Sequence, residues 1–406
     1  MIAPSFKEFG DPAKLASGAA DGAELRFEVV RDLAGLDAVK EAWKRLADRS
    51  AAPQQGFQAF AWLRSWAAAY ADEGSELHVL LGYRRDELAL IWPLGARRTL
   101  GSRVLEFLGE PLSQYHDVLI DTGADAGALL AAALRRLESA RYDILALRRV
   151  RADSKLARLL IEAGATVDRR EVAPFIDFAG FANFAAFERS LPSKARAGRR
   201  RRMRRIQELG QIAFETCSSP ARADELIETA MAFKRQWALK AGRYAPAAFD
   251  PRFGRCFRDA VRASEPNASL RVFAMLRDGR PIGVEISYAY KGRVFAHVLA
   301  PDPAYAKYGL GNALADAAIQ AAFQQGYLTY DLLAPADSYK AAWTNAGVEV
   351  LDFSLTASRR GALLHVLALG PGRRLARAAV KRAPAALARF LLRRMQRRAG
   401  ARPTPL

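Results

Sequence analysis

Residues 301–333 read PDPAYAKYGLGNALADAAIQAAFQQGYLTYDLL, and this stretch decides the fold prediction. A loop with two prolines leads through Gly309-Leu310-Gly311 into an alanine-rich segment that has no helix breaker before Gly326. A short run of tyrosine and leucine follows and ends near Asp331. The stretch therefore predicts a glycine loop, a helix and a strand, in that order.

The two glycines stand where a backbone can approach an anion. Glycine has no Cβ, and the first turn of a helix presents unpaired N–H groups at the positive end of the helix dipole. Such a site suits a phosphate or a pyrophosphate. Two glycines can equally make a tight turn and nothing more, so the neighbouring sequence has to separate the two interpretations.

The sequence just upstream predicts three antiparallel strands. The runs LRVFAML, PIGVEISYAY and VFAHVLA are separated by Asp278-Gly279 and Lys291-Gly292, which are strong hairpin signals. Downstream, we expect a second helix over residues 339–346 and a last strand over 348–356. The fold class predicted for this half is α/β with a mixed sheet.

This element order resembles the GNAT acyltransferase fold, and more closely its CelD-like branch, which is associated with bacterial cellulose and exopolysaccharide production. Residues 302–305, 307–311, 330–332 and 339–343 carry the resemblance. It implies acetyl-CoA as the acyl donor. The residues expected to bind it are Lys307, Tyr308, Gly309, Leu310, Gly311 and Asn312. One position departs from the general GNAT loop, Gln/Arg-x-x-Gly-x-Gly/Ala, because its first residue is here Ala306.

Length and composition limit the other possibilities. With 406 residues and 51% apolar content the chain can form large cores, in about two to three domains. Cys217 and Cys256 give neither a disulfide framework nor metal-ligand spacing, and the four histidines are scattered, so we expect no metal. Residues 1–24 lack a signal-peptide pattern and are expected to be a disordered lead. No apolar stretch is long enough to span a bilayer, and we expect a cytoplasmic protein.

The formal charge of +19 is concentrated in two segments. Residues 194–205 carry eight lysines and arginines, and residues 359–402 carry thirteen, without an acid in either. The rest of the chain is almost neutral. The first segment is expected to be a basic helix whose Arg199 and Arg202 contact phosphate groups of a cofactor, lipid or polysaccharide precursor. A purely solvated cationic helix is the alternative.

The first half of the chain repeats the pattern of the second. Residues 141–145, RYDIL, match 329–333, TYDLL, and 163–167, AGATV, match 346–350, AGVEV. We therefore expect tandem α/β halves over 25–180 and 181–357, followed by a basic tail over 358–406. This pairing also resembles the Fem-type aminoacyltransferases. The first half has Asp121-Thr122-Gly123 in place of Gly-x-Gly and is expected to be non-catalytic.

Acyl transfer needs a base for the nucleophile, a donor to the oxyanion and an acid for the leaving thiolate. In GNAT folds the oxyanion donor is commonly a backbone N–H on the strand before the glycine loop, here 294–300. If Lys291-Gly292 is a two-residue turn, Tyr288 pairs with Phe295 and His297 lies opposite Ile286. Side-chain alternation then places His297 with Tyr288 and away from Glu285. The unperturbed pKa of histidine is close to neutral pH, which suits a general base, although a lone strand histidine can also be structural.

Other catalytic candidates follow the strand. Asp331 lies at its carboxyl end, where open α/β sheets bind ligands, and can be a site residue or a loop cap. Lys340 is a catalytic candidate and Tyr339 a substrate-binding one, both in the Tyr-Lys-x-x-Trp element of the resemblance. Tyr305 is a candidate acid for the thiolate, and Tyr288 accompanies His297 among the catalytic candidates.

The tail changes character. A helix beginning at Pro384 would place Leu387 and Leu391 on one arc and Arg389 and Arg393 on the other, which is typical of a membrane-surface helix. An acidic partner or nucleic acid is the alternative. Residues 373–377, Arg-x-x-x-Arg, also match a cyclic di-GMP pattern that carries little information in an arginine-rich tail.

The predicted function is an acetyl-CoA-dependent acyltransferase that modifies an amino or hydroxyl group of a sugar or exopolysaccharide precursor, at the inner face of the membrane. Two alternatives remain. The first is a Fem-like aminoacyltransferase whose basic segments bind tRNA. The second is a catalytically inactive, membrane-associated binding protein.

Overall fold

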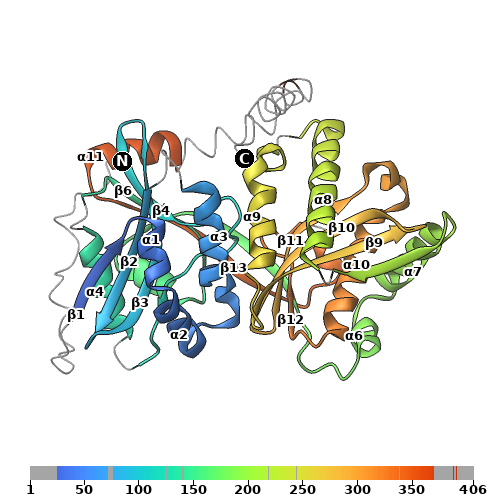
Figure 1. Ribbon diagram of the computed structural model, residues 1–406, viewed down its shortest axis with the longest axis horizontal. Coiled ribbons are helices and arrows are strands. Elements are labelled where there is room, and N and C mark those ends of the chain that lie inside the picture. Colours follow the sequence, from blue (N-terminus) through green and yellow to red (C-terminus); the bar gives the residue numbers. More distant parts are fainter. Residues whose placement is uncertain are drawn as a thin grey trace. The chain divides into compact units, whose positions relative to one another are not determined.

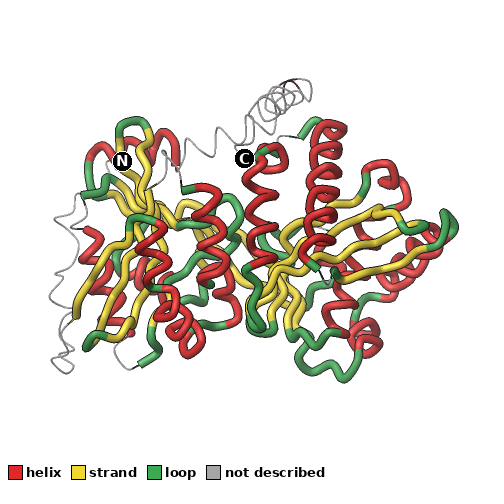
Figure 2. The backbone as a smooth tube through the Cα atoms, viewed as in Figure 1, coloured by secondary structure: helices red, strands yellow, loops and turns green. Residues whose placement is uncertain are grey.

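The computed structural model describes residues 25–71, 76–123, 126–138, 141–217, 219–243, 245–337 and 339–369, together with Leu387 and Phe390. These residues form two compact units, each built on a β-sheet with packed helices (Figures 1 and 2). The first unit comprises 25–67, 71–170 and 349–369, and the second comprises 68–70 and 171–348. The expected lead, most of the expected tail and the Arg-x-x-x-Arg pattern lie outside the described residues.

The first half of the chain alternates strands and helices. Its elements are β1 Leu25–Val30, α1 Leu33–Ala38, α2 Lys40–Ser50, α3 Phe60–Tyr70, β2 Glu76–Arg84, β3 Glu87–Thr99, β4 Ser102–Phe107, β5 Leu119–Ile120, α4 Ala126–Glu138, β6 Ile144–Arg151, α5 Lys155–Glu162 and β7 Thr166–Asp177. The sheet of the first unit has the order β1-β2-β3-β4-β6-β13. Its core is formed where Trp92, Phe107 and Leu145 meet the apolar face of α4.

The second half begins with two short helices and continues into the predicted meander. Its elements are α6 Phe184–Ser190, α7 Ser193–Gln207, β8 Ile212–Thr216, α8 Pro220–Ala241, α9 Pro251–Arg262, β9 Ala268–Arg277, β10 Arg280–Tyr290, β11 Arg293–Pro301, α10 Leu310–Gln324, β12 Thr329–Asp331, β13 Ala346–Thr356 and α11 Arg359–Leu364. The sheet of the second unit has the order β7-β12-β11-β10-β9-β8. Figure 1 shows α8 and α9 on one side of this sheet and α6 and α10 on the other.

The same pairing pattern occurs in both sheets. In the second unit, β10 and β11 are antiparallel, β11 and β12 are parallel, and β12 and β7 are antiparallel. In the first unit, β3–β4, β4–β6 and β6–β13 repeat this sequence of orientations. Each sheet ends in a strand from the other half of the chain. The units are therefore interleaved in sequence, unlike the consecutive ranges 25–180 and 181–357 that we expected.

Both predicted hairpin turns of the meander are present, at Asp278-Gly279 and Lys291-Gly292. The helix expected over 339–346 is wrong. Only a 3₁₀ turn, Lys340–Ala342, forms there, and β13 begins at Ala346. The side chain of Asn345 explains this difference, because it bonds the backbone N–H and C=O of Asp177 and so holds the chain out of a helix.

The first residues of the expected tail belong to the first unit. Leu364 on α11 is buried in a cluster with Val104, Ile144 and Ala146. Ser358 caps α11 and also donates a hydrogen bond to Asp143. The expected boundary at residue 357 therefore cuts through a packed core. No helix among the described residues has the length and apolar character needed to cross a membrane.

We predict that Leu364→Ala lowers the unfolding free energy by about 2–5 kcal/mol, because it leaves a cavity in this cluster. Leu363→Ala is the matched control, since Leu363 is 60% exposed and surface substitutions change stability by less than about 0.5 kcal/mol. Urea denaturation followed by circular dichroism measures both variants. Equal stability of the two variants would show that α11 is not part of the core.

Candidate active site

The parallel pairing of β11 with β12 is short. It covers only Arg293–Thr329, Val294–Tyr330 and Phe295–Asp331, whereas β11 continues to Pro301. Past Phe295 the two strands separate, and backbone groups of β11 from residue 296 onward face the gap. A gap of this kind lets an extended ligand approach the strand backbone.

A β-bulge lies directly after the last parallel pair. Tyr290–Arg293 and Tyr288–Phe295 pair as predicted, but Ser287 then pairs with Ala296 and Ile286 with Val298. His297 is thus the extra residue of β11, and the predicted pairing with Ile286 is wrong by one position. A bulge removes local ladder hydrogen bonds and re-aims side chains, and it is common beside active sites.

The imidazole of His297 packs against α9. Its ring is 5.2 Å from the ring of Phe257 and 6.1 Å from that of Phe253. Glu285 instead accepts a hydrogen bond from the hydroxyl of Tyr330, which belongs to the core around α6 and α10. The expected separation of His297 from Glu285 is confirmed by these contacts. Burial raises the pKa of the Glu285 carboxyl. The charge of Arg271 and the hydrogen bond from Tyr330 act in the opposite direction and lower it.

A hollow of about 360 Å³ lies at the start of α10. It is lined by Trp237, Lys240, Ala241, Pro301, Asp302, Pro303, Ala306, Gly309, Gly311 and Asn312. Gly309 has φ +73° at the helix start, and no side chain caps this helix. A Cβ on Gly311 would lie 3.3 Å from Cγ of Pro301, another residue of the wall. The glycines therefore keep the wall open at the positive end of the helix dipole.

Helix α8 supplies the other wall, which the sequence reasoning missed. Lys240 lines the hollow and its Nζ lies 3.4 Å from the carbonyl oxygen of Pro303. Lys234 donates to the carbonyl oxygen of Leu299, on the β11 segment beyond the bulge, at 3.3 Å. Burial lowers the pKa of the Lys234 ammonium. Lys234, Trp237 and Lys240 are three residues apart and share one helix face, so the spacing was a usable signal.

Asp331 is an ion-pair partner rather than an exposed base. Its side chain is fully buried, and Oδ2 accepts two hydrogen bonds from the guanidinium of Arg293, at 2.8 and 3.1 Å. Oδ1 accepts a hydrogen bond from the backbone N–H of Leu333. Both carboxylate oxygens are thus used within the fold. Of the two roles that the sequence left open, the structure supports a buried cap and not a catalytic base.

The remaining catalytic candidates are also held by structural contacts. Nζ of Lys340 is buried and donates to the carbonyl oxygens of Leu333 and Pro335, at 2.8 Å each. Tyr288 is only 2% exposed, and burial raises the pKa of its phenol. The hydroxyl of Tyr305 accepts a hydrogen bond from Arg277 at 2.8 Å. Lys340 and Tyr305, which the sequence offered as separate catalytic candidates, are thus engaged by the Leu333 and Pro335 carbonyl oxygens and by Arg277.

Two predicted binding residues lie beside the glycine loop, and Tyr339 lies elsewhere. The ammonium of Lys307 and the guanidinium of Arg205 both stack on the ring of Tyr308. Leu310, the first residue of α10, is buried, and Asn312 lines the hollow. Tyr339 is exposed and its ring contacts Trp343 edge-on. Of the six predicted donor-binding residues, Gly309, Gly311 and Asn312 line the hollow, whereas Lys307, Tyr308 and Leu310 do not. Tyr339 lies against Trp343.

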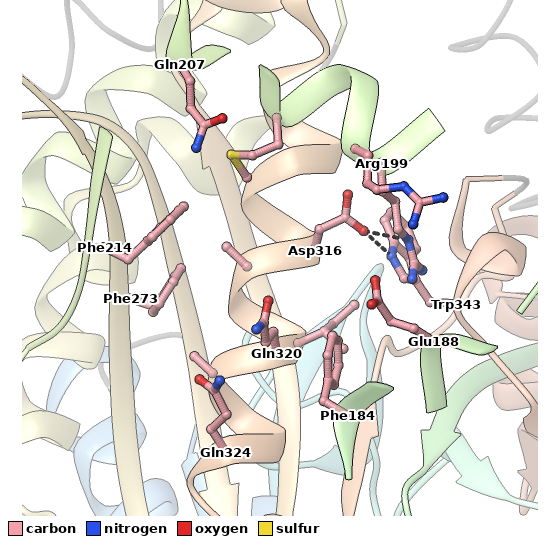
Figure 3. Close-up of a pocket in the computed structure, with 15 residues that line it drawn as sticks. Phe184, Glu188, Arg199, Gln207, Phe214, Phe273, Asp316, Gln320, Gln324 and Trp343 are labelled. Atoms are coloured by element: carbon pink, nitrogen blue, oxygen red, sulfur yellow. Dashed lines mark hydrogen bonds and ion pairs between the residues drawn. The ribbon is translucent and has the colours of Figure 1, made fainter. Parts of the chain in front are cut away.

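A second hollow, of about 400 Å³, lies along α10 beneath α7 (Figure 3). At its polar end, Asp316 accepts a 2.6 Å hydrogen bond from Trp343 and pairs with Arg199 at 2.8 Å and Arg202 at 3.2 Å. Phe214 lies on the other side of the helix in this view. Arg199 is only 8% exposed. The structure therefore gives Arg199 and Arg202 a shared intramolecular partner, Asp316, in place of the expected phosphate contacts.

Residues 193–341 match a family model described as an acetyltransferase (GNAT) domain. This region is a GNAT acetyltransferase domain. It contains the β11 bulge, the glycine loop, α10 and the α8 residues of the hollow, and it makes the chain an acyltransferase. GNAT domains use acetyl-CoA, so the donor inferred from the resemblance agrees with the domain. The finer CelD-like assignment is not tested by this match.

Solved structures show the same fold at low sequence identity. FemX has a TM-score of 0.54 and 11% identity, over 75% of this chain and 93% of its own. A Bacteroides thetaiotaomicron protein of unknown function has a TM-score of 0.52 and 11% identity, over 82% of this chain and 100% of its own. The C-terminal domain of an Agrobacterium fabrum protein described as a lysylphosphatidylglycerol synthetase has a TM-score of 0.50 and 10% identity. The match covers 82% of this chain and 95% of that domain. No curated protein sequence matches the chain.

We predict that Asp331→Ala acts on stability. It leaves the buried guanidinium of Arg293 without its partner, and breaking such a pair costs about 3–5 kcal/mol. The double variant Arg293→Met/Asp331→Leu should recover most of this loss, because neither charge remains buried. Urea unfolding gives the free energies, and turnover per folded molecule is measured in parallel. An Asp331→Asn variant of normal stability and no turnover would restore Asp331 as a catalytic residue.

Proposed function

We propose that this GNAT domain binds acetyl-CoA with its pyrophosphate in the hollow at the start of α10. The observation that carries the proposal is the uncapped first turn of α10, open between Gly309 and Gly311 and faced by Lys240. An anion there would interact with the helix dipole, with backbone N–H groups and with one ammonium. Lys240 would supply the positive charge that Ala306 does not provide at the first position of the loop.

The thioester end would lie in the gap beyond Phe295. Bound acetyl-CoA supplies the activated acyl carbonyl. Backbone N–H groups of β11 at the bulge would stabilise the oxyanion as an acceptor nitrogen or oxygen bonds to that carbonyl carbon and the C–S bond breaks. His297 would take the proton from the attacking group, and CoA would leave as the thiolate. Lys234 holds the Leu299 carbonyl and so fixes this part of β11.

For the acceptor, we propose an amino or hydroxyl group of a sugar or exopolysaccharide precursor. The support is the CelD-like sequence motif at 339–343, together with the loop at 302–311. The first unit would be a non-catalytic copy of the same α/β design. Its support is the repeated order of strand orientations in the two sheets and the absence of a Gly-x-Gly loop before α4.

A Fem-like aminoacyltransferase is a second candidate, favoured by one observation. Four arginines of α7 remain exposed although Arg199 and Arg202 turn inward: Arg200, Arg201, Arg204 and Arg205. Exposed arginines on one helix suit the phosphate backbone of tRNA. FemX and the lysylphosphatidylglycerol synthetase domain share the fold, so the fold is compatible with aminoacyl transfer.

We predict that Gly311→Leu abolishes acetyl-CoA binding in a folded protein, because the new side chain would fill the hollow. Lys240→Gln should weaken binding roughly 10- to 100-fold, the effect of losing a charge-assisted hydrogen bond. Isothermal titration calorimetry with acetyl-CoA measures both, and Lys155→Gln, an exposed lysine on α5, is the control.

Unchanged affinity in Gly311→Leu and Lys240→Gln would contradict the proposed donor site. If the wild-type protein binds no acetyl-CoA but shifts tRNA in a gel in a salt-dependent manner, the Fem-like function replaces the proposal. Loss of that shift in Arg200→Gln/Arg204→Gln would assign tRNA to α7.

We also predict that His297→Ala lowers the turnover number roughly 10²- to 10⁴-fold and leaves the affinity for acetyl-CoA unchanged. Thiol release is measured across pH with amino sugars and glucan oligosaccharides as acceptors. The acidic limb of the wild-type profile should be absent from the residual activity of the variant. A variant with a normal rate, or with an unchanged acidic limb, would remove His297 from the reaction.

We further propose that the basic C-terminal segment holds the enzyme at an anionic membrane surface. The support is its composition, with eleven lysines and arginines and no acid after residue 370. Each such residue near an anionic surface contributes roughly 1 kcal/mol. Association should therefore weaken as salt shortens the range of the lipid field.

A further inference from the structure

Four large aliphatic side chains of the first unit are exposed near one another. Leu100 is 80% exposed at the β3–β4 turn, and Leu363, Val366 and Leu367 are 60%, 54% and 59% exposed on α11 and the π-helical turn His365–Leu369 that follows it. We name these four residues the apolar patch. A contiguous exposed apolar surface marks an interaction site more often than scattered single side chains do.

The two parts of the patch are neighbours in the fold. A hollow of about 210 Å³ is lined by Leu100, Gly101, Ser102, Arg360, Leu363, Leu364 and Leu367. Leu364 anchors α11 in the core beneath it. The imidazole of His365 pairs with Asp168 at 2.5 Å. The patch is thus held in place on the first unit by a buried side chain and a hydrogen bond.

Leu100 is unusual for its backbone position. It is the first residue of a two-residue hairpin turn with φ +49°, followed by Gly101 with φ +79°. This conformation is unfavourable for leucine and favours asparagine, aspartate or glycine. In the part of the chain that the structure describes, the three other two-residue turns of this kind begin with Arg85, Asp278 and Lys291, which are polar. Folding alone does not explain an exposed leucine here.

The surroundings of the patch are positively charged. Arg98, Arg359 and Arg360 are exposed. The pKa of the nearby Asp143 carboxyl is lowered by hydrogen bonds from Ser358 and the Arg103 backbone, and also by the charges of Arg360 and Arg98. Arg360 on α11 and Arg98 on β3 therefore both lie near this carboxylate. Aliphatic side chains with arginines around them fit a bilayer surface that carries anionic headgroups.

We propose that the apolar patch is the membrane-contacting surface of the first unit, with Leu100 at the hairpin tip and Leu363, Val366 and Leu367 entering the interface of an anionic bilayer. Arg98, Arg359 and Arg360 contact lipid phosphates around them. This inference rests on the proposed membrane association and assigns it to the folded body, in addition to the basic segment. Charge selects the anionic leaflet, and apolar insertion makes the attachment persist in salt.

The experiment compares the full-length wild type with Leu100→Asp/Leu363→Gln/Leu367→Gln. Aspartate suits the first position of this turn, so the hairpin should be retained. The control is Ile161→Gln/Leu328→Gln, which changes aliphatic residues that are 55% and 61% exposed elsewhere. Co-sedimentation uses phosphatidylcholine vesicles with and without phosphatidylglycerol, in 0.1 M and 0.5 M NaCl. Acetyl-CoA affinity and circular dichroism verify that each variant is folded.

At 0.5 M salt the field of the lipid charges is screened within a few ångströms, so the basic segment contributes little. There the patch variant should partition at least roughly tenfold less than the wild type, since each buried aliphatic side chain contributes strongly. The control should bind like the wild type. At 0.1 M NaCl, Arg98→Gln/Arg360→Gln should show a reduced preference for phosphatidylglycerol, with the remaining preference due to the basic segment.

Equal partitioning of the wild type and the patch variant at both salt concentrations overturns the inference and leaves the basic segment as the only membrane contact. Wild type that fails to bind even at 0.1 M salt overturns the membrane association itself. A wild-type dimer in light scattering that the patch variant lacks, without vesicle binding, assigns the patch to self-association and also overturns the inference.

Discussion

The ion pair between Arg293 and Asp331 fixes the geometry of the second unit. It joins β11 to β12 across a parallel pairing of only three residue pairs. The ion pair spans this paired segment, from Arg293 in its first residue pair to Asp331 in its last, and beyond Phe295 the strands separate. The bulge at His297, the gap along β11 and the entry to the glycine loop all lie on the separated side. A buried pair of this kind adds little net stability compared with apolar residues, but its two directional bonds link the first paired residue of β11 to the last paired residue of β12.

Much of this arrangement could be predicted from local sequence signals. The Asp278-Gly279 and Lys291-Gly292 turns, the glycine loop and α10 each follow from neighbouring residues. The bulge could not be predicted, because pairing counted from a turn assumes a regular ladder and a single extra residue shifts everything beyond it. The roles of Asp331 and Lys340 depended on partners that only the folded chain reveals. For Asp331 that partner is Arg293, and for Lys340 it is the carbonyl oxygens of the following loop.

The roles of the charged residues likewise depended on partners that only the folded chain reveals. The arginine run of α7 is uniform in sequence, yet the helix turns Arg199 and Arg202 toward Asp316 and leaves Arg200, Arg201, Arg204 and Arg205 in solvent. Composition gives only the total charge of this segment. The helical periodicity decides which arginines pair inside the fold and which remain exposed to a ligand. In the same way, Lys240 reaches the glycine loop from a helix that ends some sixty residues earlier in the chain. Contacts between residues so far apart in the sequence cannot be predicted from the sequence around either residue.

The interleaving of the two units has a consequence for synthesis on the ribosome. The sheet of the first unit is closed by β13, which is made only after the whole second half. The amino-terminal half therefore emerges with the open edge of β6 unpaired, and native closure has to wait for residues near 350. Non-local pairing of this kind is slow and exposes strand edges while it is incomplete. Either half made alone would therefore present an unpaired strand edge, β6 in the amino-terminal half and β12 in the carboxy-terminal half.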